Sequence, residues 1–245
     1  MRSVELGCGN AGMLSLPEGS AGLILSDLPS GETQADFDKQ VDLFDFWRAA
    51  WACLRPRGAA VLFASSLKFA ATLRSSSDAF RYDMVWAKTL ATGHLNASHR
   101  PLRAHEFILV FFRTRGVYNP QMSAGHGPIH RARRVSHGEN YGKFTRATDS
   151  RAGATDRFPT SVLNFASVGT SSKSRKHPQQ KPVPLLRWLI RTFSAPGDLV
   201  VDPFAGSGSC GDAAAAEGRD WRGWDSSPRF ARPTPEPTPG KEPTT

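Results

Sequence analysis

The chain has little cysteine and no long apolar run. Its three cysteines, Cys8, Cys53 and Cys210, are far apart and form no C-x-x-C pair, which excludes a disulfide framework and a zinc knuckle. The longest apolar run, residues 107–112, is too short to cross a bilayer, and no apolar segment follows a charged start at the N-terminus. We therefore expect a soluble protein of a reducing, cytoplasmic compartment.

Acidic residues are scarce between Arg113 and Lys176. This segment holds twelve Lys or Arg and three acids, so its charge equals the formal +9 of the whole chain. A segment of this kind is either a solvated, partly disordered loop or a surface for phosphates. Its histidines have no cysteine or carboxylate at ligand spacing, so we expect no metal site; they are His126, His130 and His137.

Short apolar runs over residues 22–25, 59–63, 107–112 and 199–201 predict buried strands of a mainly parallel sheet. Apolar residues recur at helical spacing over residues 38–54 and 185–193. Strands that alternate with helices predict an α/β fold with a doubly wound, mostly parallel sheet.

The composition changes twice along this chain. We therefore predict an α/β body, residues 1–112 and 177–227, that is interrupted by a basic insert, residues 113–176. The proline-rich tail, residues 228–245, is predicted to be disordered.

A glycine-rich turn, Asp202-Pro-Phe-Ala-Gly-Ser-Gly208, follows the last apolar run and leads into an alanine-rich helix. Its glycines let the backbone approach a ligand, and the start of the helix offers free N–H groups. Asp225 comes 23 residues after Asp202, at the end of a predicted strand over residues 221–224, which is the spacing of a carboxylate that binds ribose hydroxyls. The third glycine of G-x-G-x-x-G is missing, which disfavours a nicotinamide cofactor. By itself the turn is equally typical of a tight structural connection.

Two further segments lie where open α/β sheets bind ligands. Leu25-Ser-Asp-Leu-Pro-Ser-Gly31 directly follows an apolar run, and His177-Pro-Gln-Gln-Lys-Pro182 begins the helix before Leu199. Each segment alone is also typical of an ordinary turn or helix start.

Together the three segments resemble the amino-methyltransferases of DNA. The glycine turn resembles the family's cofactor motif D-x-F-x-G-x-G, Asp27-Leu-Pro-Ser30 resembles its catalytic motif (D/N/S)-P-P-(Y/F/W), and the segment from His177 resembles H-P-x-Q-K-P. The order of catalytic motif, insert and cofactor motif is the arrangement called class β.

The resemblance implies S-adenosylmethionine as the cofactor and a catalytic motif of Asp27, Leu28, Pro29 and Ser30. The Asp27 carboxylate and a main-chain carbonyl near Leu28 would accept the hydrogens of an exocyclic amino group and direct its lone pair at the methyl group. The implied cofactor-binding residues are Asp202, Pro203, Phe204, Ala205, Gly206, Ser207, Gly208, Asp225, His177, Gln180, Lys181 and Cys8.

The resemblance also implies double-stranded DNA as the partner and N6 of adenine as the target, because Asp is commoner than Ser at the first motif position of adenine enzymes. N4 of cytosine and an RNA base stay open, as does a homodimer. The insert would supply the nucleic-acid-binding residues, namely Arg131, Arg133, Arg134, Lys143 and Arg146.

Some residues depart from the family pattern. Ser30 replaces the aromatic residue that stacks on the flipped base, a contact worth roughly 1–3 kcal/mol, so we expect Trp86 or Phe37 to take its role or activity to be weak. Cys8 stands where an acid often meets the cofactor adenine. A DNA-binding remnant that keeps the fold and has lost turnover is therefore the alternative.

A second glycine motif, Val4-Glu-Leu-Gly-Cys-Gly9, resembles the cofactor turn of ordinary class I methyltransferases. About seventeen residues separate Gly9 from Asp27, which is too few for the elements that this order needs. We therefore predict that this motif does not hold the cofactor.

Overall fold

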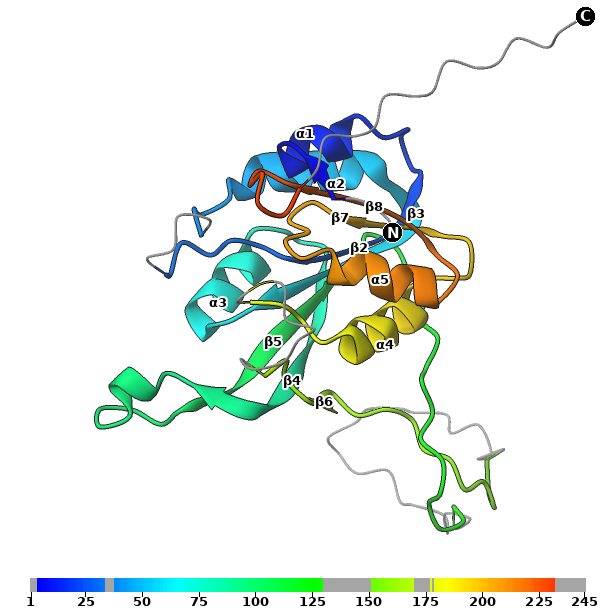
Figure 1. Cartoon of the computed structure of the whole chain (residues 1–245). Coiled ribbons are helices and arrows are strands. Elements are labelled where there is room, and N and C mark those ends of the chain that lie inside the picture. The colour runs from blue at the N-terminus through cyan, green and yellow to red at the C-terminus, as the bar shows by residue number, and fades with distance from the viewer. Residues whose placement is uncertain (1–3, 34–37, 130–150, 170–176, 178, 232–245) are drawn as a thin grey trace, which may run out of the picture. The chain divides into compact units, whose positions relative to one another are not determined.

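The computed structural model describes residues 4–33, 38–129, 151–169, 177 and 179–231 (Figure 1). Within these residues one sheet has the strand order β1-β8-β7-β2-β3-β5-β4-β6. Its strands are β1 (Glu5–Leu6), β2 (Ala21–Asp27), β3 (Leu54–Ala64), β4 (Phe80–Thr92), β5 (Arg103–Phe111), β6 (Val162–Phe165), β7 (Leu199–Asp202) and β8 (Asp220–Asp225). Helices lie between most of these strands, which confirms the predicted α/β class.

The central strands are parallel and buried. β2 pairs with β3 on one side and with β7 on the other, so Leu23 is opposite both Ala59 and Val200. Helices cover both faces of these strands, which explains why they read as continuous apolar runs in the sequence. Because β2 and β7 are parallel neighbours, Asp27 and Asp202 end their strands at the same edge of the sheet.

Two groups of helices cover the two faces. On one face, α4 (Val183–Phe193) and α5 (Ser209–Ala216) pack side by side and bury apolar side chains against Leu23 and Leu25 (Figure 1). On the other face, the core around Ile24 is closed by α1 (Gly9–Leu14), α2 (Leu43–Cys53) and α3 (Leu67–Ser75). The alternation of side chains along β2 therefore supplies both cores.

Side-chain caps decide where two helices begin. Asp42 accepts a hydrogen bond from the backbone N–H of Asp45 (3.1 Å) and starts α2, and Ser66 accepts one from Phe69 (3.0 Å) and starts α3. The helix predicted over residues 38–54 is therefore wrong at its N-terminal end, because Asp38 binds the loop before it and does not continue the helix.

In the antiparallel part of the sheet, only the strand at residues 107–112 was predicted. β5 pairs antiparallel with β3 and β4. β4 and β5 continue into a hairpin that carries the short helix η1 (His94–Asn96) (Figure 1). β4 was not predicted because about half of it faces solvent and its apolar run, residues 84–87, is short. Residues 92–102 of the hairpin are all exposed.

The predicted boundaries of the insert and the tail need correction. Pro120–Thr160 form a separate compact unit, in which Ser123 pairs with Arg157, whereas β6 belongs to the main sheet and pairs with β4. The insert is thus shorter than residues 113–176. Residues 228–231 are described, and Ala231 is buried in the main core, so the body extends past residue 227.

In the described part of the chain, no helix has the length and apolar character that a membrane span requires.

Candidate functional site

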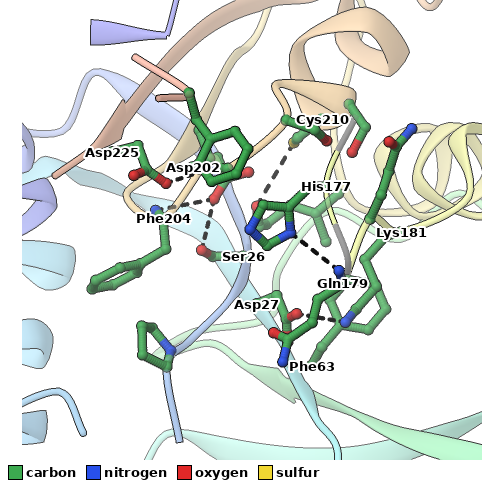
Figure 2. Close-up of a pocket in the computed structure, with 18 of the residues that line it drawn as sticks. Ser26, Asp27, Phe63, His177, Gln179, Lys181, Asp202, Phe204, Cys210 and Asp225 are labelled. Carbon is green, nitrogen blue, oxygen red and sulfur yellow. Dashed lines mark hydrogen bonds and ion pairs between the residues drawn. The ribbon is translucent and has the colours of Figure 1, made fainter. Parts of the chain in front are cut away.

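A cavity of about 290 Å³ opens at the carboxyl ends of β2 and β7 (Figure 2). This is the edge at which open α/β sheets bind ligands. The loop after β2, the segment before α4 and the turn after β7 all contribute to its wall. The lining residues are Leu25, Ser26, Asp27, Pro29, Asp38, Lys39, Phe63, His177, Gln179, Gln180, Lys181, Leu186, Asp202, Phe204, Ala205, Gly206, Ser207, Ser209, Cys210, Asp225, Ser226 and Phe230.

Asp27 is held at the wall of this cavity by an ion pair. The Lys181 ammonium donates a hydrogen bond to its Oδ2 at 2.5 Å, and the Asp27 side chain stays 26% exposed (Figure 2). Burial raises the pKa of Asp27 above its usual value and the negative charge of Glu106 adds to this, although Lys181 opposes it. The carboxylate is therefore a stronger proton acceptor than an exposed aspartate, and it reaches the cavity.

Asp202 lies deeper in the same wall. Its Oδ1 accepts hydrogen bonds from the Ser26 hydroxyl (2.7 Å) and the Phe204 backbone N–H (3.2 Å). Burial, together with the nearby charges of Asp27 and Asp225, raises the pKa of Asp202 to about 7 despite these hydrogen bonds. Asp27, Asp202 and Asp225 are three of the four carboxyl groups that line the cavity. These groups outnumber the two lining lysines, which favours a ligand that carries positive charge.

The glycine turn is built around the third of these carboxyl groups. Asp225 accepts hydrogen bonds from the backbone N–H groups of Gly206 (3.0 Å) and Ser227 (2.8 Å). Gly206 has φ of +47° and Gly208, the N-cap of α5, has φ of +74°, a region that side chains with a Cβ rarely adopt. The motif glycines are therefore required by the path of the chain over the cavity.

The segment before α4 forms the opposite wall. His177 accepts a hydrogen bond from the Gln179 N–H at its Nδ1 (3.1 Å), and its ring packs edge-on against Phe230 at 4.5 Å between centroids. A Cβ on Gly206 would lie 3.8 Å from the His177 ring, so this segment and the glycine turn face each other closely. Phe230 was missed because it lies in the segment that was predicted to be a disordered tail.

Asp38 fixes the loop that follows Asp27. Its carboxylate accepts backbone N–H hydrogen bonds from Ser30 (2.7 Å), Gly31 (2.9 Å) and Thr33 (2.8 Å). Burial tends to raise the pKa of Asp38, but these hydrogen bonds outweigh it and lower the pKa below the usual value. No motif contains Asp38, and its distance from Asp27 in the sequence gave no signal of this role.

Most of the predicted site residues line the cavity, and some do not. Asp27, Pro29, Gln180, Lys181 and Asp225 do, as do His177, Asp202 and the turn residues from Phe204 to Ser207. Leu28 is buried in the core, which leaves its main chain to the site, and Ser30 faces a separate hollow beside Lys68 and Thr72. Pro203, Gly208 and Cys8 are not among the lining residues, and Cys8 is exposed just before α1.

The motif Val4-Glu-Leu-Gly-Cys-Gly9 contributes packing. A Cβ on Gly9 would collide with the Pro203 carbonyl, and a Cβ on Gly12 would collide with the Trp224 ring. These glycines let α1 pack closely against the glycine turn and β8. The second glycine of the motif, Gly9, therefore has a structural explanation, as does Gly12 beyond the motif.

Of the two predicted substitutes for the missing aromatic residue, Trp86 lies in the described part of the chain and does not line the cavity. Trp86 is 3% exposed and donates from its Nε1 to the Phe165 carbonyl (2.9 Å), so the prediction that it stacks on a base is wrong. Phe37 lies outside the described residues, as do the predicted nucleic-acid-binding residues Arg131, Arg133, Arg134, Lys143 and Arg146. Among the described side chains, no group of three or more His, Cys, Asp or Glu could hold a metal ion.

A family model described as "DNA methylase" matches residues 32–234, so the match begins just after Ser30. The type II methyltransferase M.HpaI of Haemophilus parainfluenzae is 26% identical over 216 residues, which are 82% of this chain and 63% of that enzyme. The DNA adenine methyltransferase YhdJ of Escherichia coli K12 is 38% identical over 77 residues, 31% of this chain and 26% of that protein. The chain thus spans less than two thirds of these relatives.

Solved structures show the same fold. An M1.HpyAVI–SAM complex has a TM-score of 0.60 at 20% identity and covers 94% of this chain and 95% of that one. The cytosine-N4-specific PvuII DNA methyltransferase has a TM-score of 0.65 at 16% identity, with 92% and 82% covered.

Proposed function

Because the chain belongs to the DNA methylase family, we propose that it transfers the methyl group of S-adenosylmethionine to the exocyclic N6 of adenine in double-stranded DNA. One observation carries the proposal. Asp27 and Pro29 of the catalytic motif line the same cavity as the glycine turn and the segment from His177.

The cavity fits the cofactor in charge and in shape. When bound, S-adenosylmethionine supplies an activated methyl group on a positively charged sulfonium. The lining aspartates outnumber the lining cations Lys39 and Lys181, so the cavity carries the opposite charge. Gly206 would let the cofactor approach the backbone, and His177 with Phe230 would close the other side.

Asp27 would prepare the amino group for transfer. An exocyclic amino group is a poor nucleophile because its lone pair is delocalised into the ring. The Asp27 carboxylate and the main-chain carbonyl near Leu28 accept its two hydrogens and so localise the lone pair. The hydrogen bonds from the loop N–H groups to Asp38 keep these acceptors in place, and transfer then depends mainly on orientation.

Several charges support DNA as the partner. Residues 113–176 carry the whole excess charge of the chain. The exposed hairpin segment 92–102 adds Arg100 and contains no acid. Such one-sided charge binds phosphates without regard to base sequence, so the target base must be selected in the cavity.

Incubation with labelled S-adenosylmethionine and unmethylated duplex DNA tests the proposal. We expect labelled N6-methyladenine after digestion to nucleosides, and its loss in Asp27→Ala. Asp212→Ala changes an exposed aspartate of α5 and should leave the transfer intact. Labelled N4-methylcytosine would replace the adenine assignment with cytosine, and cofactor binding without any transfer would identify a catalytically inactive remnant.

A further inference from the structure

Four charged side chains form a buried row behind the catalytic motif. Lys181 Nζ lies 2.5 Å from Asp27 Oδ2 and 3.1 Å from Glu106 Oε2, and Lys88 Nζ lies 3.1 Å from Glu106 Oε1. The exposed fractions of the Lys88, Lys181 and Glu106 side chains are 7%, 10% and 12%. The row joins β4 and β5 to the segment before α4 and to the end of β2.

The charges of this row balance, and each internal member contacts both neighbours. Burying a charge is costly unless it is paired, and removing one partner leaves the other uncompensated. Lys181 also lies over the Phe63 ring, at 5.1 Å from its centroid, so its position is restricted from a third side. Glu106 therefore leaves Lys181 little freedom to move away from Asp27.

We propose that Glu106 is a positioning residue that acts through Lys181 to fix the orientation and the charge state of Asp27. The proposal rests on the methyl-transfer function of the site. Asp27 and Lys181 line the cavity, whereas Glu106 does not, so Glu106 affects the reaction only indirectly.

The hydrogen bond from Lys181 also gives the two carboxylate oxygens of Asp27 different roles. Oδ2 is occupied by Lys181, and within the described residues Oδ1 accepts no hydrogen bond. The partly exposed carboxylate therefore presents Oδ1 to an amino group in the cavity. Without Glu106, Lys181 loses the second contact that holds it in this position.

The charges around Asp27 predict pKa shifts of opposite sign when Lys181 or Glu106 is removed. Lys181 stabilises the ionised carboxylate, whereas Glu106, Asp38 and Asp202 disfavour it, and Lys88 partly offsets Glu106. Loss of Lys181 should raise the pKa of Asp27. Loss of Glu106 removes a negative charge, which should lower that pKa while Lys181 stays beside Asp27 and the Phe63 ring. A general loss of stability would shift the pKa of Asp27 in neither variant, and a fall in kcat in Glu106→Asp, which keeps the charge, reports the positioning role.

The experiment compares Lys181→Gln, Lys181→Arg and Glu106→Gln in the full chain. NMR of the carboxyl carbons, assigned with Asp27→Asn, measures the pKa of Asp27 directly. The acid limb of the pH profile of kcat reports the same pKa during turnover. We expect a rise of about one unit in Lys181→Gln, a value near wild type in Lys181→Arg, and a fall of about half a unit in Glu106→Gln. The value of kcat in Glu106→Gln should fall about tenfold with KM for the cofactor little changed.

Asp198→Asn is the matched control. Asp198 forms a two-bond ion pair with Arg55 (2.7 and 2.5 Å) at the opposite, amino end of β7. This variant should lose stability and leave the pKa of Asp27 unchanged. Glu106→Asp keeps the charge and shortens the side chain, so it should lower kcat without shifting the acid limb of the pH profile. This variant also replaces Glu106→Gln if that variant does not fold.

An unchanged pKa of Asp27 in both Lys181→Gln and Glu106→Gln would overturn the proposal. So would an unchanged kcat in Glu106→Asp. Wild-type protein that transfers no methyl group would contradict the proposed function, while the NMR titration would still decide whether Glu106 and Lys181 control the charge of Asp27.

Discussion

Asp202 is the buried carboxyl group whose charge should control cofactor binding. Its pKa of about 7 lies above the usual value, so it is protonated below pH 7 and ionised above. The affinity for S-adenosylmethionine should therefore fall as the pH falls through 7, by up to about tenfold between pH 8 and 6. S-adenosylhomocysteine lacks the sulfonium charge and should show a weaker pH dependence in titration calorimetry.

Asp202→Asn should flatten the pH dependence for S-adenosylmethionine, and Asp212→Asn should leave it as in wild type. An equally steep dependence in Asp202→Asn would assign the titration to another group.

Ser30 occupies the place of the missing aromatic residue. Its N–H is held by Asp38 and its side chain faces the separate hollow beside Lys68, so a Tyr side chain there must turn toward the cavity to reach a flipped base. Ser30→Tyr should tighten binding of DNA with a flipped or mismatched target base by roughly 1–3 kcal/mol. Fluorescence of a base analogue at the target position measures this, with Ser30→Leu as a control for added bulk. Equal or weaker binding in Ser30→Tyr would show that another group fills this space.

At the scale of the element, the turn after β7 depends on the conformation of its glycines. Gly206 and Gly208 have positive φ, and a Cβ on Gly208 would lie 3.2 Å from Val4. Changing either glycine to Ala should cost about 1–2 kcal/mol of unfolding free energy and also weaken cofactor binding. Urea denaturation and calorimetry measure the two effects.

Gly218→Ala provides the matched control for the turn. Gly218 has φ of +69°, and a Cβ there would meet nothing within 4 Å. This variant should lose similar stability and keep wild-type cofactor affinity. If all three variants bind the cofactor normally, the glycine turn does not hold it.

At the scale of the whole molecule, the C-terminal boundary can be tested by truncation. A chain that ends at Ser227 loses Phe230, which packs against His177, and Ala231, which is buried. It should bind S-adenosylmethionine more weakly and unfold at a lower temperature than a chain that ends at Ala231. Calorimetry and thermal denaturation compare the two with the full chain, and equal behaviour would return residues 228–231 to the tail.

The sequence by itself determined the α/β class, the positions of the central strands and the three motifs. The class and the strands depend on local signals, because buried parallel strands need apolar side chains on both faces. The motifs were identified by their resemblance to a known family and by their order along the chain. Asp27, His177 and Asp202 were therefore found without coordinates.

Only the tertiary structure decided how these residues are connected. The pairing of Lys181 with Asp27 spans 154 positions, and Glu106 joins it from β5. The burial of Trp86, the role of Asp38 and the place of Phe230 likewise depend on contacts between distant segments. Pattern and spacing carry no information on such contacts, because they arise only when packing brings the elements together.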